Sequence, residues 1–282
     1  MSLAELGRLL WGTVVYRPYV YAFFACFLVF ALHQLGWKRA LTFTVSTWLV
    51  AFGAEYSSTR NGFPFGPYSY FDATRTRELW ISNVPFWDSL SFVFLSYFSM
   101  VLAAALLSPR GTLSRGALRP LGRRAPPRLS LQGTAQRGGW PGLHHPAMPL
   151  LGGLLMVALD VVIDPVALQG EKWFLGRIYE YPYRGFYFGV TAANFGGWFL
   201  VGAASQWLFQ RSARWLPWCR GPWRATRPGF AWAAFAVYAG VFGFNLAMAL
   251  LIRDLALAGA SAAVIALTLV PLGSALRARG AG

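Results

Sequence analysis

The chain has 282 residues, of which 56% are hydrophobic, 17% aromatic and only 12% charged, against about 25% charged residues in soluble domains. A soluble globule of this size could not bury so much apolar surface, which excludes an ordinary cytosolic enzyme, and the composition also excludes disordered and fibrous proteins. The 25 lysines and arginines outnumber the 10 acids and give a formal charge of +15, but they stand between apolar runs, as membrane-protein loop charges do, which argues against nucleic-acid binding. The composition therefore predicts an all-α fold, a polytopic helical bundle in the cell membrane.

Apolar runs predict about seven transmembrane helices, because a span needs about 20 mostly apolar residues. In chain order they cover roughly residues 19–35, 41–54, 86–107, 147–168, 187–209, 230–252 and 255–276. Residues 3–15 are too short to cross a bilayer, and we expect them to lie on its surface. No internal repeat is visible, so residues 1–282 are expected to form a single integral membrane domain.

The basic residues favour one orientation. With the N-terminus outside, 16 of the 25 lysines and arginines fall on the inner side and 9 on the outer side, so the positive-inside rule predicts N-out/C-in. Arg8 and Arg17 alone would pull the N-terminus inward. The loop at about 108–146 has seven arginines, no acidic residue and many Gly and Pro, which predicts a flexible cytoplasmic loop near the anionic leaflet.

The few acidic residues near the predicted spans identify a candidate site. A charged group at membrane depth costs at least about 2.5–3.5 kcal/mol, so it usually has a task or a partner. Glu55 follows the second predicted helix, and Asp160 and Asp164 share one face of the fourth because they are four residues apart. In the favoured orientation these three acids and Asn194, near the start of the fifth helix, fall in one outer layer.

A purely structural interpretation stays open. Glu55 could pair with Arg60, and Asp164 with Arg177 or Arg184, as structural ion pairs. Asp88 and Asp254 stand at predicted interfaces and are expected to be structural. Aromatic residues could form an interfacial belt, and Gly196 and Gly197 could simply permit close helix packing.

Carboxyl groups and aromatic rings inside a bilayer suit two kinds of chemistry. A buried carboxylic acid can keep its proton at neutral pH, and aromatic faces stabilise cations. This combination fits acid-catalysed attack on an isoprenoid alkene, and it fits a proton-coupled transporter nearly as well. The two cysteines and three histidines are not spaced like a metal-binding set, so no metal site is expected.

Several short motifs together are similar to those of a known family. They are Glu55, GFPFGPYSY at 62–70, VP at 84–85, Asp160 with the Asp164-Pro165 pair, Tyr187, and NFGGW at 194–198. The set resembles the membrane carotenoid-biosynthesis family that includes carotenoid 1,2-hydratases (CruF type) and bisanhydrobacterioruberin hydratase. The resemblance covers roughly residues 50–205, and neither the last two predicted helices nor the arginine-rich loop contributes a motif to it.

The resemblance implies hydration of the terminal 1,2 double bond of an acyclic carotenoid end group without a cofactor. By chemical reasoning, Asp160 or Glu55 would donate the proton, while Asp164 and Asn194 would hold the water. The expected substrate-binding residues, which would flank the cation and the chain, are Phe65, Tyr68, Tyr70, Tyr187 and Trp198.

The implied partners are water, membrane lipids and a carotenoid such as lycopene or a monocyclic carotenoid with an acyclic end, and contact with other carotenoid enzymes is a further expectation. Three other functions stay open. They are a proton-coupled transporter of a small solute, a non-catalytic scaffold of carotenoid biosynthesis, and another end-group enzyme such as a cyclase. A cyclase would share the protonation step but lose a proton instead of adding water.

Overall fold

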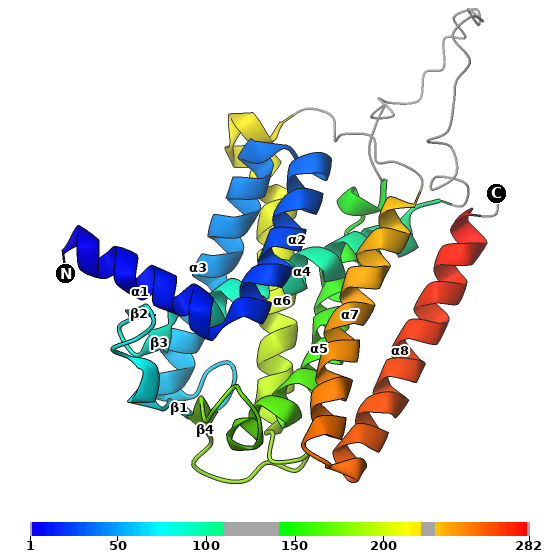
Figure 1. The fold of residues 1–282 in the computed structure, drawn as a ribbon. Coiled ribbons are helices and arrows are strands. Elements are labelled where there is room, and N and C mark those ends of the chain that lie inside the picture. The colour runs from blue at the N-terminus through cyan, green and yellow to red at the C-terminus, as the bar shows by residue number, and fades with distance from the viewer. Residues whose placement is uncertain (1, 110–140, 221–228, 281–282) are drawn as a thin grey trace, which may run out of the picture.

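The computed structural model describes residues 2–109, 141–220 and 229–280 (Figure 1). The expected all-α architecture is confirmed for these residues, because the strands are only two residues long. The helices are α1 (Leu3–Tyr16), α2 (Pro18–Gln34), α3 (Trp37–Asn61), α4 (Phe86–Leu107), α5 (Met148–Ala167), α6 (Ala192–Trp215), α7 (Phe230–Leu251) and α8 (Leu255–Gly280). The strands are β1 (Ser69–Tyr70), β2 (Trp80–Ile81), β3 (Val84–Pro85) and β4 (Tyr179–Glu180).

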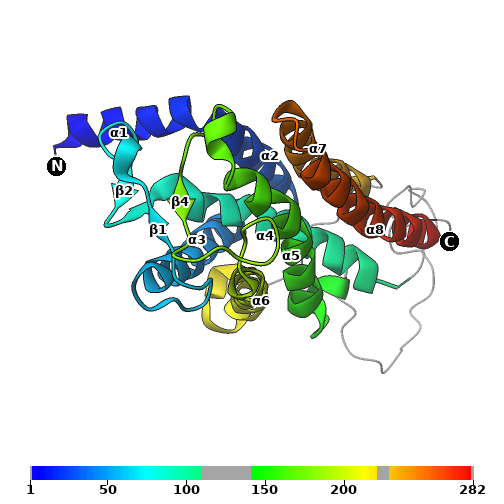
Figure 2. The ribbon, with the colours of Figure 1, turned by 90° about the horizontal axis from the view of Figure 1, so that it is seen from below.

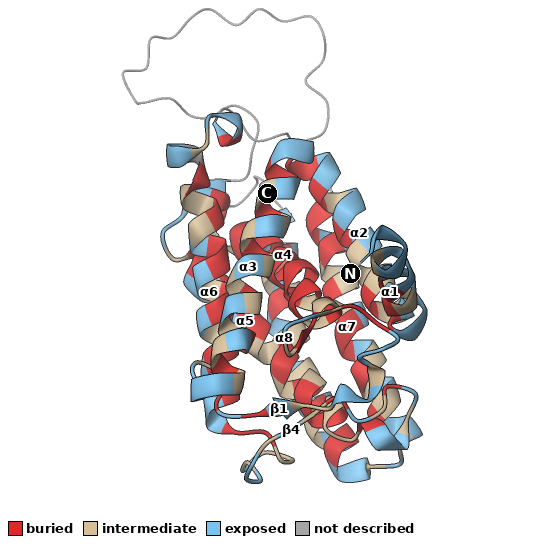
Figure 3. Ribbon diagram, turned by 90° about the vertical axis from the view of Figure 1, so that its left-hand side faces the viewer, coloured by how far each residue is buried: buried red, intermediate tan, exposed pale blue. Residues whose placement is uncertain are grey.

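Helix α4 forms the centre of the bundle. It contacts α2, α3, α5, α6, α7 and α8, and it lies between its neighbours when the bundle is seen from below (Figure 2). Its sequence is mostly apolar around the whole helix, as expected for a helix without a solvent face, and most of its residues are buried. The surrounding helices bury one face and expose the other (Figure 3).

Helices α1 and α2 meet at a sharp elbow. The bend between them is 95°, and Pro18 begins α2 at a position where the missing N–H costs no hydrogen bond. Helix α1 projects from the side of the bundle (Figures 1 and 2) and exposes Leu3, Trp11 and Val15. The position of residues 3–15 on the membrane surface stays a prediction, and the exposed apolar side chains of α1 are the feature that favours it.

Four helices, α4, α5, α7 and α8, are long and apolar enough to cross a membrane among the described residues, and the bent α1–α2 pair would add a fifth if it were one span. All seven predicted runs are helical, but the count of seven spans is not confirmed. Helix α2 has only 17 residues, and α3 and α6 are less apolar along their length than the four helices that qualify. The N-out/C-in orientation and the single domain stay predictions, and the loop at about 108–146 lies mostly outside the described residues.

Two helix boundaries differ from the prediction in ways that matter for the site. Helix α3 continues past residue 54 to Asn61, where Gly62 adopts φ 80° and ends it, so Glu55 stands inside the helix. Helix α6 begins at Ala192 rather than at residue 187, so Tyr187 belongs to the preceding turn.

A short antiparallel ladder joins two loops that are distant in sequence. Strand β1 pairs with β4 so that Tyr70 lies opposite Tyr179, and the Phe71 N–H donates to the Ile178 carbonyl at 2.8 Å. The second ladder, β2–β3, leads directly into α4. Both ladders lie at the end of the bundle where α3 and α5 finish and α4 and α6 begin (Figure 1).

Candidate active site

A cavity of about 50 Å³, here called the polar cavity, lies at this end of the bundle. That volume is enough to hold water. It gathers seven of the nine residues that the sequence predicted for the site. Its lining residues are Glu55, Phe65, Tyr68, Tyr70, Asp88, Phe92, Asp164, Tyr179, Tyr181, Asn194 and Trp198.

Tyr70 bridges two carboxyl groups on different helices. Its hydroxyl oxygen lies 2.9 Å from Glu55 Oε2 on α3 and 2.5 Å from Asp88 Oδ2 on α4. A phenol has a single proton, so it can donate to only one of them, and the second bond forms only if that carboxyl donates its own proton. The geometry therefore favours one protonated carboxyl beside Tyr70. The other oxygen of Glu55, Oε1, is buried and has no hydrogen-bond partner within the described part of the chain.

The cavity keeps its tyrosines protonated. Burial, followed by the neighbouring charges of Asp88 and Glu55, raises the pKa of Tyr70 well above its ordinary value. Burial is also the main reason why the pKa of Tyr68 and that of Tyr179 are raised. These side chains are therefore hydrogen-bond donors at neutral pH rather than phenolates.

A second carboxyl pair shares an amide. Asn194, in the first turn of α6, donates through Nδ2 to Asp160 Oδ1 and Oδ2 at 3.1 and 3.0 Å, and to Asp164 Oδ2 at 2.6 Å. Both aspartates are on one face of α5, as their spacing predicted, and both are buried. Asp164 lines the polar cavity, whereas Asp160 stands behind Asn194 and is not among the lining residues.

Aromatic rings form the apolar part of the wall. Phe92 lies with its ring centroid 4.5 Å from that of Trp198 and 5.8 Å from that of Phe65. Phe65 packs directly on α6 because position 197 is glycine: a Cβ there would stand 2.3 Å from Phe65 Cδ1. Such faces can stabilise a nearby cation.

The structural ion pairs that the sequence left open are not formed. Arg60 instead bonds to Ser82 and Asn83, and Arg177 pairs with Glu171 and Glu180. No lysine or arginine is among the lining residues of the polar cavity, as far as the structure describes the chain. The carboxyl groups therefore meet in a cavity whose described lining contains no basic side chain.

Four residues of the lining were not predicted: Asp88, Phe92, Tyr179 and Tyr181. Asp88 was expected to be structural because it opens a helix at a predicted interface. Tyr179 and Tyr181 come to the cavity through the β1–β4 ladder, which a sequence pattern does not reveal. Their Tyr-x-Tyr spacing repeats that of Tyr68 and Tyr70, and this is the signal that could have found them.

Tyr187 lies away from the polar cavity. It is half-buried in a turn before α6. Its ring contacts the rings of Phe186, Phe188 and Phe195.

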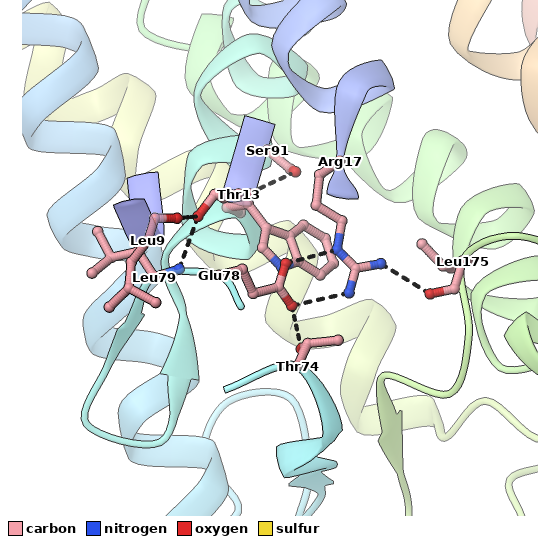
Figure 4. A network of polar contacts seen from close by, with 9 residues as sticks. Leu9, Thr13, Arg17, Thr74, Glu78, Leu79, Ser91 and Leu175 are labelled. Atoms are coloured by element: carbon pink, nitrogen blue, oxygen red, sulfur yellow. Dashed lines mark hydrogen bonds and ion pairs between the residues drawn. The ribbon is translucent and has the colours of Figure 1, made fainter. Parts of the chain in front are cut away.

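A buried ion pair fixes the α1–α2 elbow beside the site (Figure 4). Arg17 donates Nε and Nη2 to the Glu78 carboxylate, both at 3.1 Å, and Nη1 to the Leu175 carbonyl at 3.0 Å. The Thr74 hydroxyl also bonds to Glu78, and the Arg17 guanidinium lies 4.5 Å from the Trp87 ring centroid. The pair thus holds the elbow and two loops against the first turn of α4, which carries Asp88.

The fold and the site define an all-helical membrane protein with buried carboxyl groups at one end. The sequence profile of a family described as carotenoid biosynthesis proteins matches residues 15–270, and the chain therefore belongs to that family. A bisanhydrobacterioruberin hydratase from Haloarcula japonica is 30% identical over 213 residues, which cover 73% of this chain and 58% of that relative. The chain thus covers less than two thirds of the relative's length. No solved structure matches the chain.

The described part of the chain contains no group of side chains that is suited to bind a metal ion. Within 2–109, 141–220 and 229–280, no three His, Cys, Asp or Glu side chains are grouped so that they could hold one.

Proposed function

We propose that the chain is a carotenoid hydratase that adds water across the terminal 1,2 double bond of an acyclic carotenoid end group and yields a tertiary 1-hydroxy carotenoid. Membership of the carotenoid-biosynthesis family and a relative named as a hydratase support this assignment. The observation that carries it is a buried cavity in which carboxyl groups, phenols and aromatic rings meet without a lysine or arginine among its described lining residues.

The first step is protonation of the alkene. A neutral carboxyl group, Glu55 or Asp160, breaks its O–H bond, and the π electrons of the double bond form the new C2–H bond. A tertiary cation results at C1, the more stabilised carbon. Phe65, Tyr68, Tyr70 and Trp198 would flank the cation and the chain.

The second step is attack by water. Asp164 and Asn194 hold a water molecule in the polar cavity, and its oxygen lone pair forms the C1–O bond. The Asp164 carboxylate accepts the released proton, which returns to the acid through the cavity, so the net change is addition of one water. One acid and one base are enough, and no cofactor is involved.

The location of the cavity suits a rigid polyene substrate. The cavity lies at one end of the bundle, where the ends of a membrane-spanning carotenoid and interfacial water can meet. Lycopene and a monocyclic carotenoid with an acyclic end present the same terminal group. Membrane lipids would surround the exposed apolar faces of the helices.

The proposal is tested by the pigments of carotenoid-producing cells that express the chain. Glu55→Gln and Asp164→Asn should each lower the amount of hydrated pigment by about 100-fold or more, since general acid–base groups contribute that much. Asp72→Asn, at an exposed carboxyl that pairs with Arg75, is the matched control and should leave the yield unchanged. Wild-type yields in both carboxyl variants would contradict the mechanism and favour a scaffold.

A further inference from the structure

A second, larger cavity lies against the polar one. Its volume is about 110 Å³, and most of its lining is apolar, so we call it the apolar cavity. Tyr19 and Phe23 come from α2, Ile163 from α5 and Phe244 from α7, and Leu175 comes from the loop before β4. Tyr19 stacks on Phe244 with ring centroids 5.5 Å apart, which joins α2 to α7 at this wall.

The two cavities share part of their walls. The residues that line both are Asp88, Phe92, Asp164, Tyr179 and Trp198. Glu55 lines only the polar cavity, and Asp160 lines neither. Of the four carboxyl groups, only Asp88 and Asp164 could therefore touch a molecule in the apolar cavity.

The surroundings of these two aspartates differ. Asp164 accepts from an amide N–H of Asn194 at 2.6 Å, and an amide can only donate there, which suits a carboxylate that takes up a proton. Asp88 instead contacts the Tyr70 hydroxyl, which also contacts Glu55. A proton can therefore pass from Glu55 through Tyr70 to Asp88. Asp88 is also only partly buried, whereas Asp164 is buried with 8% of its surface exposed.

We propose that the apolar cavity holds the terminal isoprenoid unit of the carotenoid and that Asp88 is the catalytic residue that donates a proton to C2 of its terminal double bond. This inference rests on the proposed function and changes its first step. Asp88, which the sequence had placed as structural, replaces Glu55 or Asp160 as the group that protonates the alkene, and Glu55 instead reloads Asp88 through Tyr70. A hydrocarbon end needs an apolar enclosure, and its proton must come from a group that reaches both cavities.

The proton balance closes within these residues. Asp88, as the one protonated carboxyl beside Tyr70, breaks its O–H bond as the C2–H bond forms, and it becomes a carboxylate. Asp164 receives the proton that the attacking water loses. Water in the polar cavity, which both Glu55 and Asp164 line, carries that proton to Glu55. Glu55 then gives it to the Tyr70 oxygen while Tyr70 gives its own proton to the Asp88 carboxylate, which restores the starting state.

The experiment separates chemistry from binding by using lycopene as the probe. Asp88→Asn should lower hydration of lycopene in membranes by about 100-fold or more, while the lycopene absorption that co-purifies with the protein stays within about twofold of wild type. Asp88→Glu, which keeps a carboxyl group, should recover part of the rate. The exposed Asp72→Asn change is the control for loss of a charge.

The hydrocarbon site has its own variant. Ala167 lines the apolar cavity, so Ala167→Leu should fill it and lower the co-purified lycopene several-fold. The exposed Ala233→Leu on α7 makes the same change outside the cavity and should leave binding unchanged. Equal lycopene in the two variants would overturn the hydrocarbon site.

Other outcomes are equally decisive. Wild-type hydration in Asp88→Asn, with Glu55→Gln and Asp164→Asn inactive, overturns the role of Asp88 and leaves the hydratase intact. If Asp88→Asn aggregates on size exclusion, Tyr70→Phe replaces it, because it interrupts the path from Glu55, and an unchanged rate in that variant overturns the proposal. No hydrated lycopene from wild-type protein that binds lycopene would contradict the proposed function and not the hydrocarbon site.

Discussion

Phe65 reaches the cavity because the residue it packs against has no side chain. Gly197, in α6, leaves room for the Phe65 ring, and its neighbour Gly196 has nothing within 4 Å of where a Cβ would stand. Gly197 is therefore needed for the position of Phe65, whereas Gly196 has open space beside it. The sequence alone does not separate the two, because close helix packing would explain either glycine.

Alanine at each glycine tests this difference. Gly197→Ala should displace Phe65 and lower hydration at least about tenfold, because small misplacements at a reacting centre are costly. Gly196→Ala should keep wild-type activity and be neutral or stabilising by up to about 1 kcal/mol, since alanine favours a helix. Pigment yield and thermal unfolding in detergent measure both effects, and equal activity losses in the two variants would contradict the packing argument.

Some site residues follow from the sequence and others do not. The four-residue spacing of Asp160 and Asp164 placed them on one face of a helix, and Asn194 in the next predicted helix joined them, as the hydrogen bonds show. Asp88 was not predicted as a site residue, because a charged residue at the start of a transmembrane helix usually lies at the membrane–water interface. Only three-dimensional packing brings it to Tyr70, which belongs to another segment.

At the scale of elements, the α1–α2 elbow depends on the ion pair of Arg17 with Glu78. The two side chains are 4% and 0% exposed, so a change that removes one partner leaves the other charge buried. Arg17 is therefore not a free loop charge but part of the packing of the elbow.

Variants of this pair should show strong coupling. Arg17→Met or Glu78→Leu alone should lower the free energy of unfolding by about 3–5 kcal/mol, whereas the double variant should lose less than either, because no charge is left unpaired. The exposed Arg75–Asp72 pair is the comparison, and Arg75→Met should cost less than about 1 kcal/mol. Additive losses, measured by unfolding in detergent, would contradict a buried pair.

Helix existence was predictable from apolar runs, but the joining of the loops was not. Each predicted run contains a helix, because long apolar stretches determine helices in a membrane protein. The β1–β4 pairing links segments about 110 residues apart through two-residue strands, and such strands have no periodicity to detect. Only the three-dimensional fold therefore assigns Tyr179 and Tyr181 to the site.

At the scale of the whole molecule, the titratable groups of the site gather at one end of the bundle. Burial, which is the largest cause, raises the pKa of Tyr68, Tyr70, Tyr179 and Tyr181 above the ordinary value of a phenol. The folded state therefore holds these protons more tightly than the unfolded chain does.

This distribution predicts a loss of stability at alkaline pH. A raised phenol pKa gives stability that is complete below the unfolded value of about 10 and is lost as the pH rises above it. The temperature of half-unfolding should therefore decrease as the pH is raised from about 9 to 11. Tyr179→Phe should make this decrease smaller, whereas Tyr183→Phe, at an exposed ring, should leave it unchanged. A midpoint that is constant over this range would contradict the burial of the phenols.

The most direct test of the account is hydration of lycopene in H₂¹⁸O by membranes that contain the chain. We expect a more polar pigment that is heavier by one water, with one ¹⁸O atom in each new tertiary hydroxyl group and none in membranes without the chain. A product of the same mass as lycopene without ¹⁸O would identify a cyclase. Unchanged lycopene, with the protein present and folded, would contradict the proposed function.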